Sequence, residues 1–222
     1  MPGDAAHGWW PEAALLAAFV GLTCALAAGA FLDVDLGVRD WCDTHRAEPL
    51  RLAARGLNFV GSANLLAPIL LGLAGIVGIR RRTARPVLPV LLTLAAGYAV
   101  VVPLKMLADR SAPHSAHANA VELFANDSGW SYPSGHVVNA VIWYGLVVVL
   151  LDAVLRRPLP DPARRLIRVL PVVIVTATVT YLGFHWLTDA AAGLLLGLAL
   201  DRVLRRVRWV QRSPRVRDQV LV

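Results

Sequence analysis

Six blocks of mostly apolar residues, each about as long as a membrane-spanning helix, dominate this chain of 222 residues. They cover about residues 12–32, 57–79, 86–108, 136–155, 166–183 and 186–204. A helix needs about 20 apolar residues to cross the hydrocarbon core of a bilayer. Only 17% of the residues are charged, against about a quarter in soluble domains. The sequence therefore predicts an all-α membrane protein, one domain over residues 1–222, folded as a bundle of six transmembrane helices.

The distribution of arginine predicts the orientation of this bundle. The net charge is +7, and Lys105 is the one lysine among 22 basic residues. Most arginines lie in two short loops and the C-terminal tail: Arg80, Arg81, Arg82, Arg85, Arg156, Arg157, Arg164, Arg165, Arg168 and the seven from Arg202 to Arg217. Such clusters beside membrane spans are typical of the cytoplasmic side, and this placement argues against a nucleic-acid-binding surface. With six spans, both termini are expected in the cytoplasm, and residues 205–222 form a basic cytoplasmic tail.

The first outer loop, residues 33–56, mixes charged residues with the apolar Leu36, Trp41, Leu50 and Leu52. This mixture predicts an amphipathic helix that lies on the outer membrane surface after the first span. An ordinary helix in a solvated loop is the alternative reading of the same pattern.

Three segments that are distant in sequence are predicted to meet at the outer face. The third span ends near Lys105, the fourth begins at Ser134-Gly135-His136, and the sixth begins near His185. Ionisable groups at such positions are costly unless they serve a function. The free backbone N–H groups at the start of the fourth span favour an anion, although a capping serine and an incidental glycine would give the same sequence.

The spacing of His185 and Asp189, i and i+4, predicts that both side chains lie on one face of the sixth helix. The carboxylate can then accept the Nδ1–H of the imidazole and leave Nε2 as a nucleophile or base. A purely structural His–Asp pair is the alternative, and Lys105 alone is compatible with a lysine that extends toward the membrane surface.

Together these segments resemble the type-2 phosphatidic acid phosphatase (PAP2) superfamily. Its signature comprises a lysine, six residues and Arg-Pro; then Pro-Ser-Gly-His; then Ser-Arg, five residues, His, three residues and Asp. Here Pro133-Ser134-Gly135-His136 is intact, His185 and Asp189 keep the third spacing, and Lys105 and Pro113 keep the first. The resemblance spans roughly residues 86–204 and implies the six-helix arrangement of the family.

Two arginines of the family signature are absent. Ala112 takes the place of the first, and Thr178-Val179 stands where the family has Ser-Arg. Arg110 lies two residues before Ala112, so in an extended segment it would project to the same side and replace one phosphate contact. A surface-directed Arg110 is the alternative. An arginine of the first outer loop would supply the other missing phosphate contact: Arg39, Arg46, Arg51 or Arg55.

The resemblance implies hydrolysis of a lipid phosphate monoester or pyrophosphate, phosphatidic acid-like or polyprenyl, at the outer leaflet of a bacterial plasma membrane. His185 would form a phosphohistidine, Asp189 would orient it, and His136 would protonate the leaving oxygen. The phosphate-binding residues would be Lys105, Ser134, Gly135 and Arg110. The family implies no metal and no other cofactor. Two alternatives remain open: a lipid phosphotransferase that uses an alcohol as acceptor, and a non-catalytic lipid-phosphate-binding protein.

Overall fold

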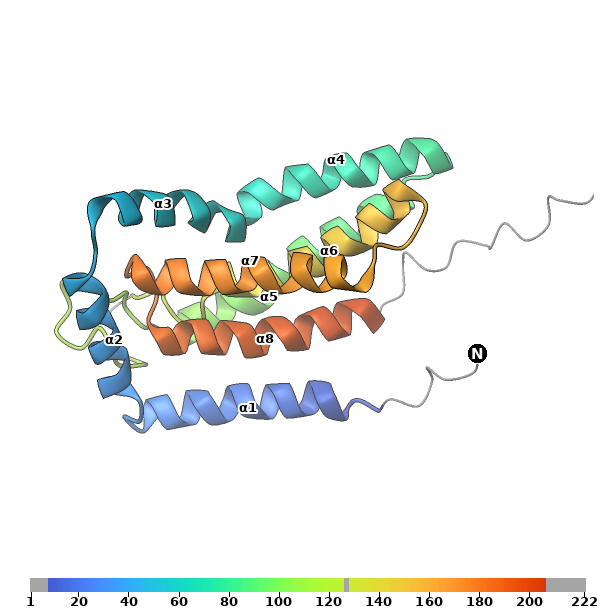
Figure 1. The fold of residues 1–222 in the computed structure, drawn as a ribbon. Helices are drawn as coiled ribbons and strands as arrows, with labels where there is room; N and C mark the ends of the chain where they lie inside the picture. Colours follow the sequence, from blue (N-terminus) through green and yellow to red (C-terminus); the bar gives the residue numbers. More distant parts are fainter. Residues whose placement is uncertain (1–7, 126–127, 207–222) are drawn as a thin grey trace, which may run out of the picture.

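All regular secondary structure is helical in the part that the computed structural model describes, residues 8–125 and 128–206 (Figure 1). The α-helices are α1 (Trp10–Ala27), α2 (Leu32–Thr44), α3 (Glu48–Asn58), α4 (Ala63–Arg81), α5 (Leu88–Ala108), α6 (Gly135–Leu155), α7 (Asp161–Tyr181) and α8 (Leu187–Arg206). Two 3-10 turns, η1 (Phe59–Gly61) and η2 (Arg85–Val87), precede α4 and α5.

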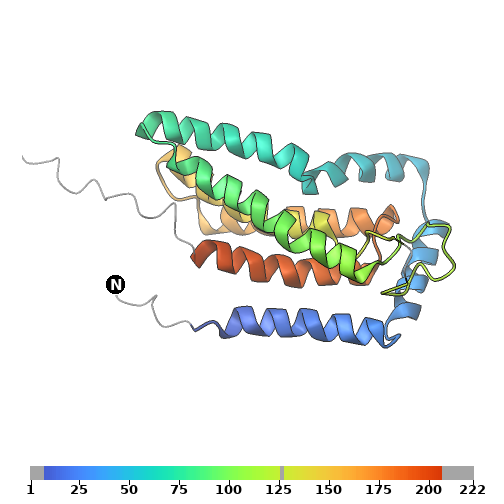
Figure 2. The same ribbon diagram turned by 180° about the vertical axis from the view of Figure 1, so that it is seen from behind.

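The long helices run side by side along one axis, and α2 crosses one end of the bundle (Figures 1 and 2). The loop between α5 and α6 folds over that same end, next to α2. Helix α1 begins and α8 ends at the opposite end. This arrangement is the one expected when an even number of helices traverses the bundle.

Six long helices coincide with the six predicted spans, with shifted boundaries. Four of them are long and apolar enough to cross a membrane: α1, α4, α5 with η2, and α6. Helix α7 includes Arg164, Arg165 and Arg168, and α8 includes acidic residues as well as arginines. For these two helices, membrane spanning stays a prediction.

Two predicted boundaries were wrong for a local reason. The first span was expected to continue to residue 32, but α1 ends at Ala27 because Gly29 and Phe31 adopt positive φ angles, 83° and 65°. The second was expected to begin at residue 57. That residue belongs to α3, and α4 begins only after η1 and Ser62.

The outer loop forms two helices where the sequence predicted one. Helix α2 caps the end of the bundle and buries Asp35 and Cys42. Helix α3 turns back and packs beside α7. Its Leu50 and Leu57 are exposed on the protein surface.

Helix α6 lies in the centre and contacts α4, α5, α7 and α8. Apart from a few polar residues, among them His136 and Asn139, it carries apolar side chains on all sides, which is the pattern of a helix buried within a bundle. Gly193 and Gly197 of α8 face it closely: a Cβ at Gly193 would lie 2.6 Å from the Ser134 carbonyl oxygen. Small residues allow such close packing between helices in membranes, and here they bring the start of α8 against the start of α6.

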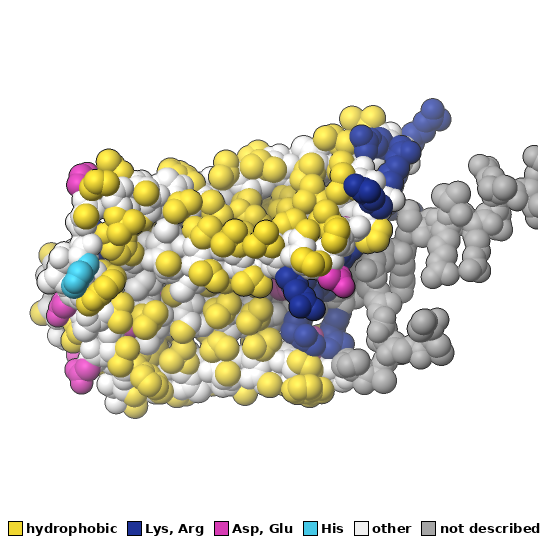
Figure 3. All heavy atoms as spheres, in the orientation of Figure 1, with side chains coloured by type: hydrophobic (Ala, Val, Ile, Leu, Met, Phe, Trp, Pro, Cys, Tyr) yellow, Lys and Arg dark blue, Asp and Glu magenta, His cyan; other side chains and the backbone are white. Residues whose placement is uncertain are grey.

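The two ends of the bundle differ in chemistry. Lys and Arg side chains gather where α8 ends, while apolar side chains cover the middle of the molecule (Figure 3). At the arginine-rich end Asp201 pairs with Arg168 and Arg205, and Glu12 pairs with Arg206. Most of the predicted basic tail, residues 207–222, lies outside the described residues.

Candidate active site

A cavity of about 500 Å³ opens near the α2 end of the bundle, and four of the predicted site residues line it. They are Lys105 from the end of α5, Gly135 and His136 from the start of α6, and His185 from the turn before α8. The imidazole rings of His136 and His185 lie 6.0 Å apart, centroid to centroid, at an interplanar angle of 63°. The convergence of the three segments that the sequence predicted is therefore present in the structure.

Asp189 lies behind His185, fully buried, in the first turn of α8. The distance from His185 Nδ1 to Asp189 Oδ2 is 3.6 Å, which is too long for a direct hydrogen bond. Ser131 lies between them: its hydroxyl donates to Asp189 Oδ2 and is 3.3 Å from His185 Nδ1. A hydroxyl that donates to the carboxylate can still accept the Nδ1–H, so the geometry supports a chain from His185 through Ser131 to Asp189.

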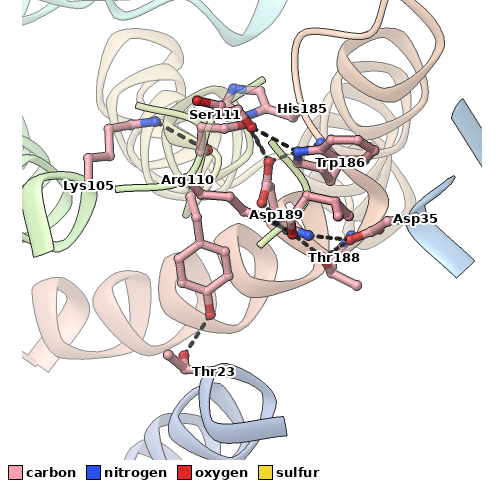
Figure 4. Close-up of polar contacts among 12 residues, drawn as sticks. Thr23, Asp35, Lys105, Arg110, Ser111, His185, Trp186, Thr188 and Asp189 are labelled. Carbon is pink, nitrogen blue, oxygen red and sulfur yellow. Dashed lines mark hydrogen bonds and ion pairs between the residues drawn. The ribbon is translucent and has the colours of Figure 1, made fainter. Parts of the chain in front are cut away.

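Arg110 occupies a different place from the one predicted. Its side chain is completely buried, does not line the cavity, and donates to Asp189 Oδ1 at 2.6 Å and to Asp35 Oδ2 at 2.7 Å (Figure 4). Further donations go to the Thr188 hydroxyl and the Val121 carbonyl. The guanidinium is held by two carboxylates behind the histidine because a buried arginine needs such partners.

Asp35 joins α2 to the start of α8. Its carboxylate accepts hydrogen bonds from the backbone N–H of Thr188 at 3.0 Å and from the Thr188 hydroxyl, in addition to the Arg110 pair (Figure 4). Both acids and the arginine have side-chain exposures of 0%. The three ionic side chains form one buried network that spans α2, the α5–α6 loop and α8.

Ser134 and Lys105 differ in their access to the cavity. The backbone N–H of Ser134 donates to the Asp189 carbonyl at 3.0 Å, and its buried hydroxyl makes no hydrogen bond. Ser134 does not line the cavity. Lys105 does, and its ammonium donates to the backbone carbonyls of Trp130 and Ser131. Among the residues that line the cavity, Lys105 is the only lysine or arginine.

The position of one missing family arginine is filled by apolar packing. Val179 is fully buried in an apolar cluster with Val137, Ala140, Val175 and Ala190. The outer-loop arginines with described contacts bond elsewhere: Arg39 to Asp40, Arg46 to Asp43 and the Tyr181 carbonyl, and Arg51 to Glu48. None of them lines the cavity.

Further hydrogen bonds, which the sequence did not indicate, connect the α5–α6 loop to α1 and to the start of α8. The Tyr132 hydroxyl is 2.6 Å from the Thr23 hydroxyl of α1, and burial raises the pKa of Tyr132 to about 12. The Trp186 indole N–H donates to the Ser111 carbonyl at 2.8 Å, and its backbone N–H donates to Asp189. These bonds position Ser131 and His185 beside the same carboxylate oxygen, Oδ2 of Asp189.

Sequence reasoning assigned no role to Ser131, Asp35 or Thr188. Ser131 stands three residues before the Ser134-Gly135-His136 segment, and that proximity was the only available signal. Asp35 lies among several acids in the outer loop and nothing in the sequence distinguishes it. Within residues 8–125 and 128–206, no group of three or more His, Cys, Asp or Glu side chains is arranged to hold a metal ion.

The comparisons with known proteins agree with the resemblance noted in the sequence. The chain is 25% identical over 185 residues to phosphatidylglycerophosphatase B of Bacillus subtilis (strain 168), over 82% of this chain and 87% of that protein. Its fold is similar to the crystal structure of a transmembrane PAP2 type phosphatidylglycerolphosphate phosphatase from Bacillus subtilis, with TM-score 0.75 and 23% identity, covering 93% of this chain and 98% of that one. The family model of the PAP2 superfamily matches residues 86–213, so the chain belongs to the PAP2 superfamily.

Proposed function

We propose that the protein is a membrane lipid phosphatase that hydrolyses a lipid phosphate ester through a phosphohistidine at His185. The observation that carries this proposal is the facing pair of imidazoles, 6.0 Å apart across the cavity, with a buried carboxylate behind one of them. The nucleophile needs a basic nitrogen toward the substrate and an acceptor for its other N–H, and the His185–Ser131–Asp189 chain supplies that acceptor. The family membership and the named Bacillus relative agree with this chemistry.

In the first step, Nε2 of His185 attacks phosphorus, and the bond from phosphorus to the lipid oxygen breaks. His136, across the cavity, donates its proton to the departing oxygen, which leaves as the lipid alcohol. The Lys105 ammonium and the N–H of Gly135 face the same space and would bind the phosphoryl oxygens. The imidazolium that forms at His185 is stabilised by the carboxylate of Asp189.

In the second step, water attacks the phosphohistidine. His136, now neutral, accepts a proton from this water, and inorganic phosphate leaves as the N–P bond breaks. His185 and His136 return to their starting states, so the cycle balances without a redox cofactor.

Arg110 and Asp35 act in this proposal as positioning residues. Arg110 holds Oδ1 of Asp189, so that Oδ2 stays directed toward Ser131, and Asp35 holds Arg110 from the other side. The network replaces our expectation that Arg110 binds phosphate. The cavity then has one strong cation, Lys105, for the substrate anion.

Phosphate release from phosphatidic acid by the purified protein in detergent with EDTA tests the proposal. We expect His185→Ala to abolish release and His136→Ala to lower kcat strongly, while His117→Ala, in the α5–α6 loop away from the cavity, retains it. Rapid quenching with labelled substrate in alkaline SDS, where phosphohistidine is stable, should trap a phosphorylated protein in the wild type. Release that survives His185→Ala would refute the phosphohistidine mechanism.

Product analysis separates hydrolysis from transfer to an alcohol, because both reactions share the phosphohistidine. Labelled phosphate in solution indicates a hydrolase, and label in a new lipid indicates a phosphotransferase. Binding of vanadate without turnover of any lipid donor would indicate a non-catalytic protein.

A further inference from the structure

The cavity continues past the two histidines into the membrane-spanning part of the bundle. Beyond them it is lined by Leu94, Gly97, Tyr98, Val101 and Val102 of α5, by Asn139 and Trp143 of α6, and by residues 61–64 at the start of α4. Most of this lining is apolar, as expected for a cavity that receives a lipid. Besides the Tyr98 and Trp143 rings, three non-aromatic polar side chains interrupt it: Ser62, Asn64 and Asn139. We refer to these three as the amide subsite.

None of the three side chains has a hydrogen-bond partner among the described residues. Ser62 is the residue that precedes α4, a position where serine normally caps the helix, yet its hydroxyl makes no capping bond. No side-chain hydrogen bond forms at Asn64 or Asn139 either, although an amide can make up to four. Polar groups at this depth cost free energy unless they find a partner, so polar residues within spans mark functional positions.

The amide subsite lies at a defined distance from the proposed phosphate position. Asn139 follows His136 by three residues, so both side chains lie on one face of α6. The rise of a helix places Asn139 about 4.5 Å deeper along the axis. The oxygen on the middle carbon of a glycerol phosphate lies at a similar distance from its phosphorus.

Gly97 of α5 keeps the amide of Asn139 accessible. A Cβ at Gly97 would lie 3.8 Å from Asn139 Oδ1, in ordinary van der Waals contact. Any side chain longer than that of alanine would extend over the amide. The facing wall therefore leaves the carboxamide open to a ligand in the cavity.

We propose that the amide subsite selects the substrate by hydrogen bonding to the ester or hydroxyl oxygens of a glycerol unit next to the phosphate. This inference rests on the proposed phosphatase function and specifies which class of lipid phosphate the enzyme prefers. A glycerol-based lipid phosphate satisfies the amides of Asn64 and Asn139. A polyprenyl phosphate presents only hydrocarbon there and leaves the half-buried amide of Asn139 desolvated and unpaired. Sites built for hydrogen bonding reject analogues that lack the polar group in this way.

The test measures kcat/KM for phosphatidic acid and for a polyprenyl phosphate in mixed micelles. The variants are Asn139→Leu and Asn64→Leu, which remove the amide at similar volume. Asn64 is exposed on the protein surface, so its replacement does not disturb the core. The control is Thr176→Val in α7, a polar-to-apolar change in a long helix outside the cavity.

We expect the wild type to prefer phosphatidic acid. Each asparagine variant should lose about threefold to tenfold in kcat/KM for phosphatidic acid, the effect of one neutral hydrogen bond, with polyprenyl phosphate turnover unchanged or faster. Thr176→Val should leave the ratio of the two substrates unchanged. A wild type that prefers polyprenyl phosphate, or variants that slow both substrates equally, would overturn the inference and leave the phosphatase intact. Absence of His185-dependent release from either lipid would instead overturn the proposed function, and the inference with it.

Discussion

Ser131 connects the two residues on which the proposed chemistry depends. Its hydroxyl is buried, donates to Asp189 Oδ2 and lies 3.3 Å from His185 Nδ1. Without it, the 3.6 Å gap between the imidazole and the carboxylate would have no bonded path. The hydroxyl thereby selects the tautomer that presents a basic Nε2 to the cavity.

Ser131→Ala should lower kcat for phosphate release by about ten- to a hundredfold with little change in KM. The reason is that a hydrogen bond to a charged group contributes about 1.5–3 kcal/mol, here to the orientation of the nucleophile. Steady-state kinetics with phosphatidic acid provides the measurement.

Two further variants separate this role from simple packing. Ser131→Thr keeps the hydroxyl and should recover most of the activity. Ser115→Ala removes a hydroxyl that has no hydrogen-bond partner and should behave as the wild type. If Ser131→Ala were fully active, His185 would have to bond Asp189 directly in the working enzyme.

At this scale the sequence predicted the residues that a contiguous motif or a helical spacing can reveal. His136 stands in an intact motif, and His185 and Asp189 are one helical turn apart. Arg110 was expected at the phosphate because of its nearest family position, Ala112, whereas the structure buries it against Asp189. Its true surroundings depend on Asp35 and Asp189, which lie 75 and 79 residues away, and no local pattern encodes such an encounter.

The carboxylate of Asp35 connects helix α2 to helix α8. Asp35 accepts bonds from Thr188 and Arg110 while the rest of α2 lies across the end of the bundle. Removing one member of a buried ionic network lowers the stability of the fold, because the remaining charges stay buried without their partner. The position of the outer helix and the orientation of Asp189 therefore depend on the same network.

Asp35→Asn should lower the free energy of unfolding by about 1.5–3 kcal/mol, the contribution of a charge-assisted hydrogen bond, and should also reduce kcat. Thermal unfolding in detergent and phosphate release measure the two effects. The matched control is Asp33→Asn on the same helix, an exposed acid with the same change in charge, which should alter neither. Equal effects of the two variants would mean that net charge, not the buried network, matters.

The elements divide into those that hydropathy predicts and those that it does not. The cores of the six long helices were predictable because each must present about 20 apolar residues to lipid or to its neighbours. The sequence pattern could not predict that residues 33–56 form two helices, α2 and α3. The turn between them depends on contacts of α2 with α8 and of α3 with α7, which are distant in sequence. The end of α1 was misplaced because apolar residues continue through a turn with positive φ angles.

The whole molecule has one arginine-rich end (Figure 3). The candidate site lies near the other end. Arginine clusters remain on the cytoplasmic side of membrane proteins, so the cavity with His185 should face outward. The loops at the two ends offer equivalent probes: Ala118 is exposed between α5 and α6, and Ala84 is exposed between α4 and α5.

In a background with Cys24→Ala and Cys42→Ala, Ala118→Cys should react with a membrane-impermeant maleimide in intact cells. Ala84→Cys should react only after the membrane is permeabilised. Removing the native cysteines is a precaution, since Cys24 is exposed, while burial raises the pKa of the Cys42 thiol and keeps it unreactive. Labelling of Ala84→Cys alone in intact cells would reverse the orientation. The cavity would then draw its lipid from the inner leaflet, because a substrate whose acyl chains stay in the bilayer can enter only from the leaflet at the depth of His136 and Asn139.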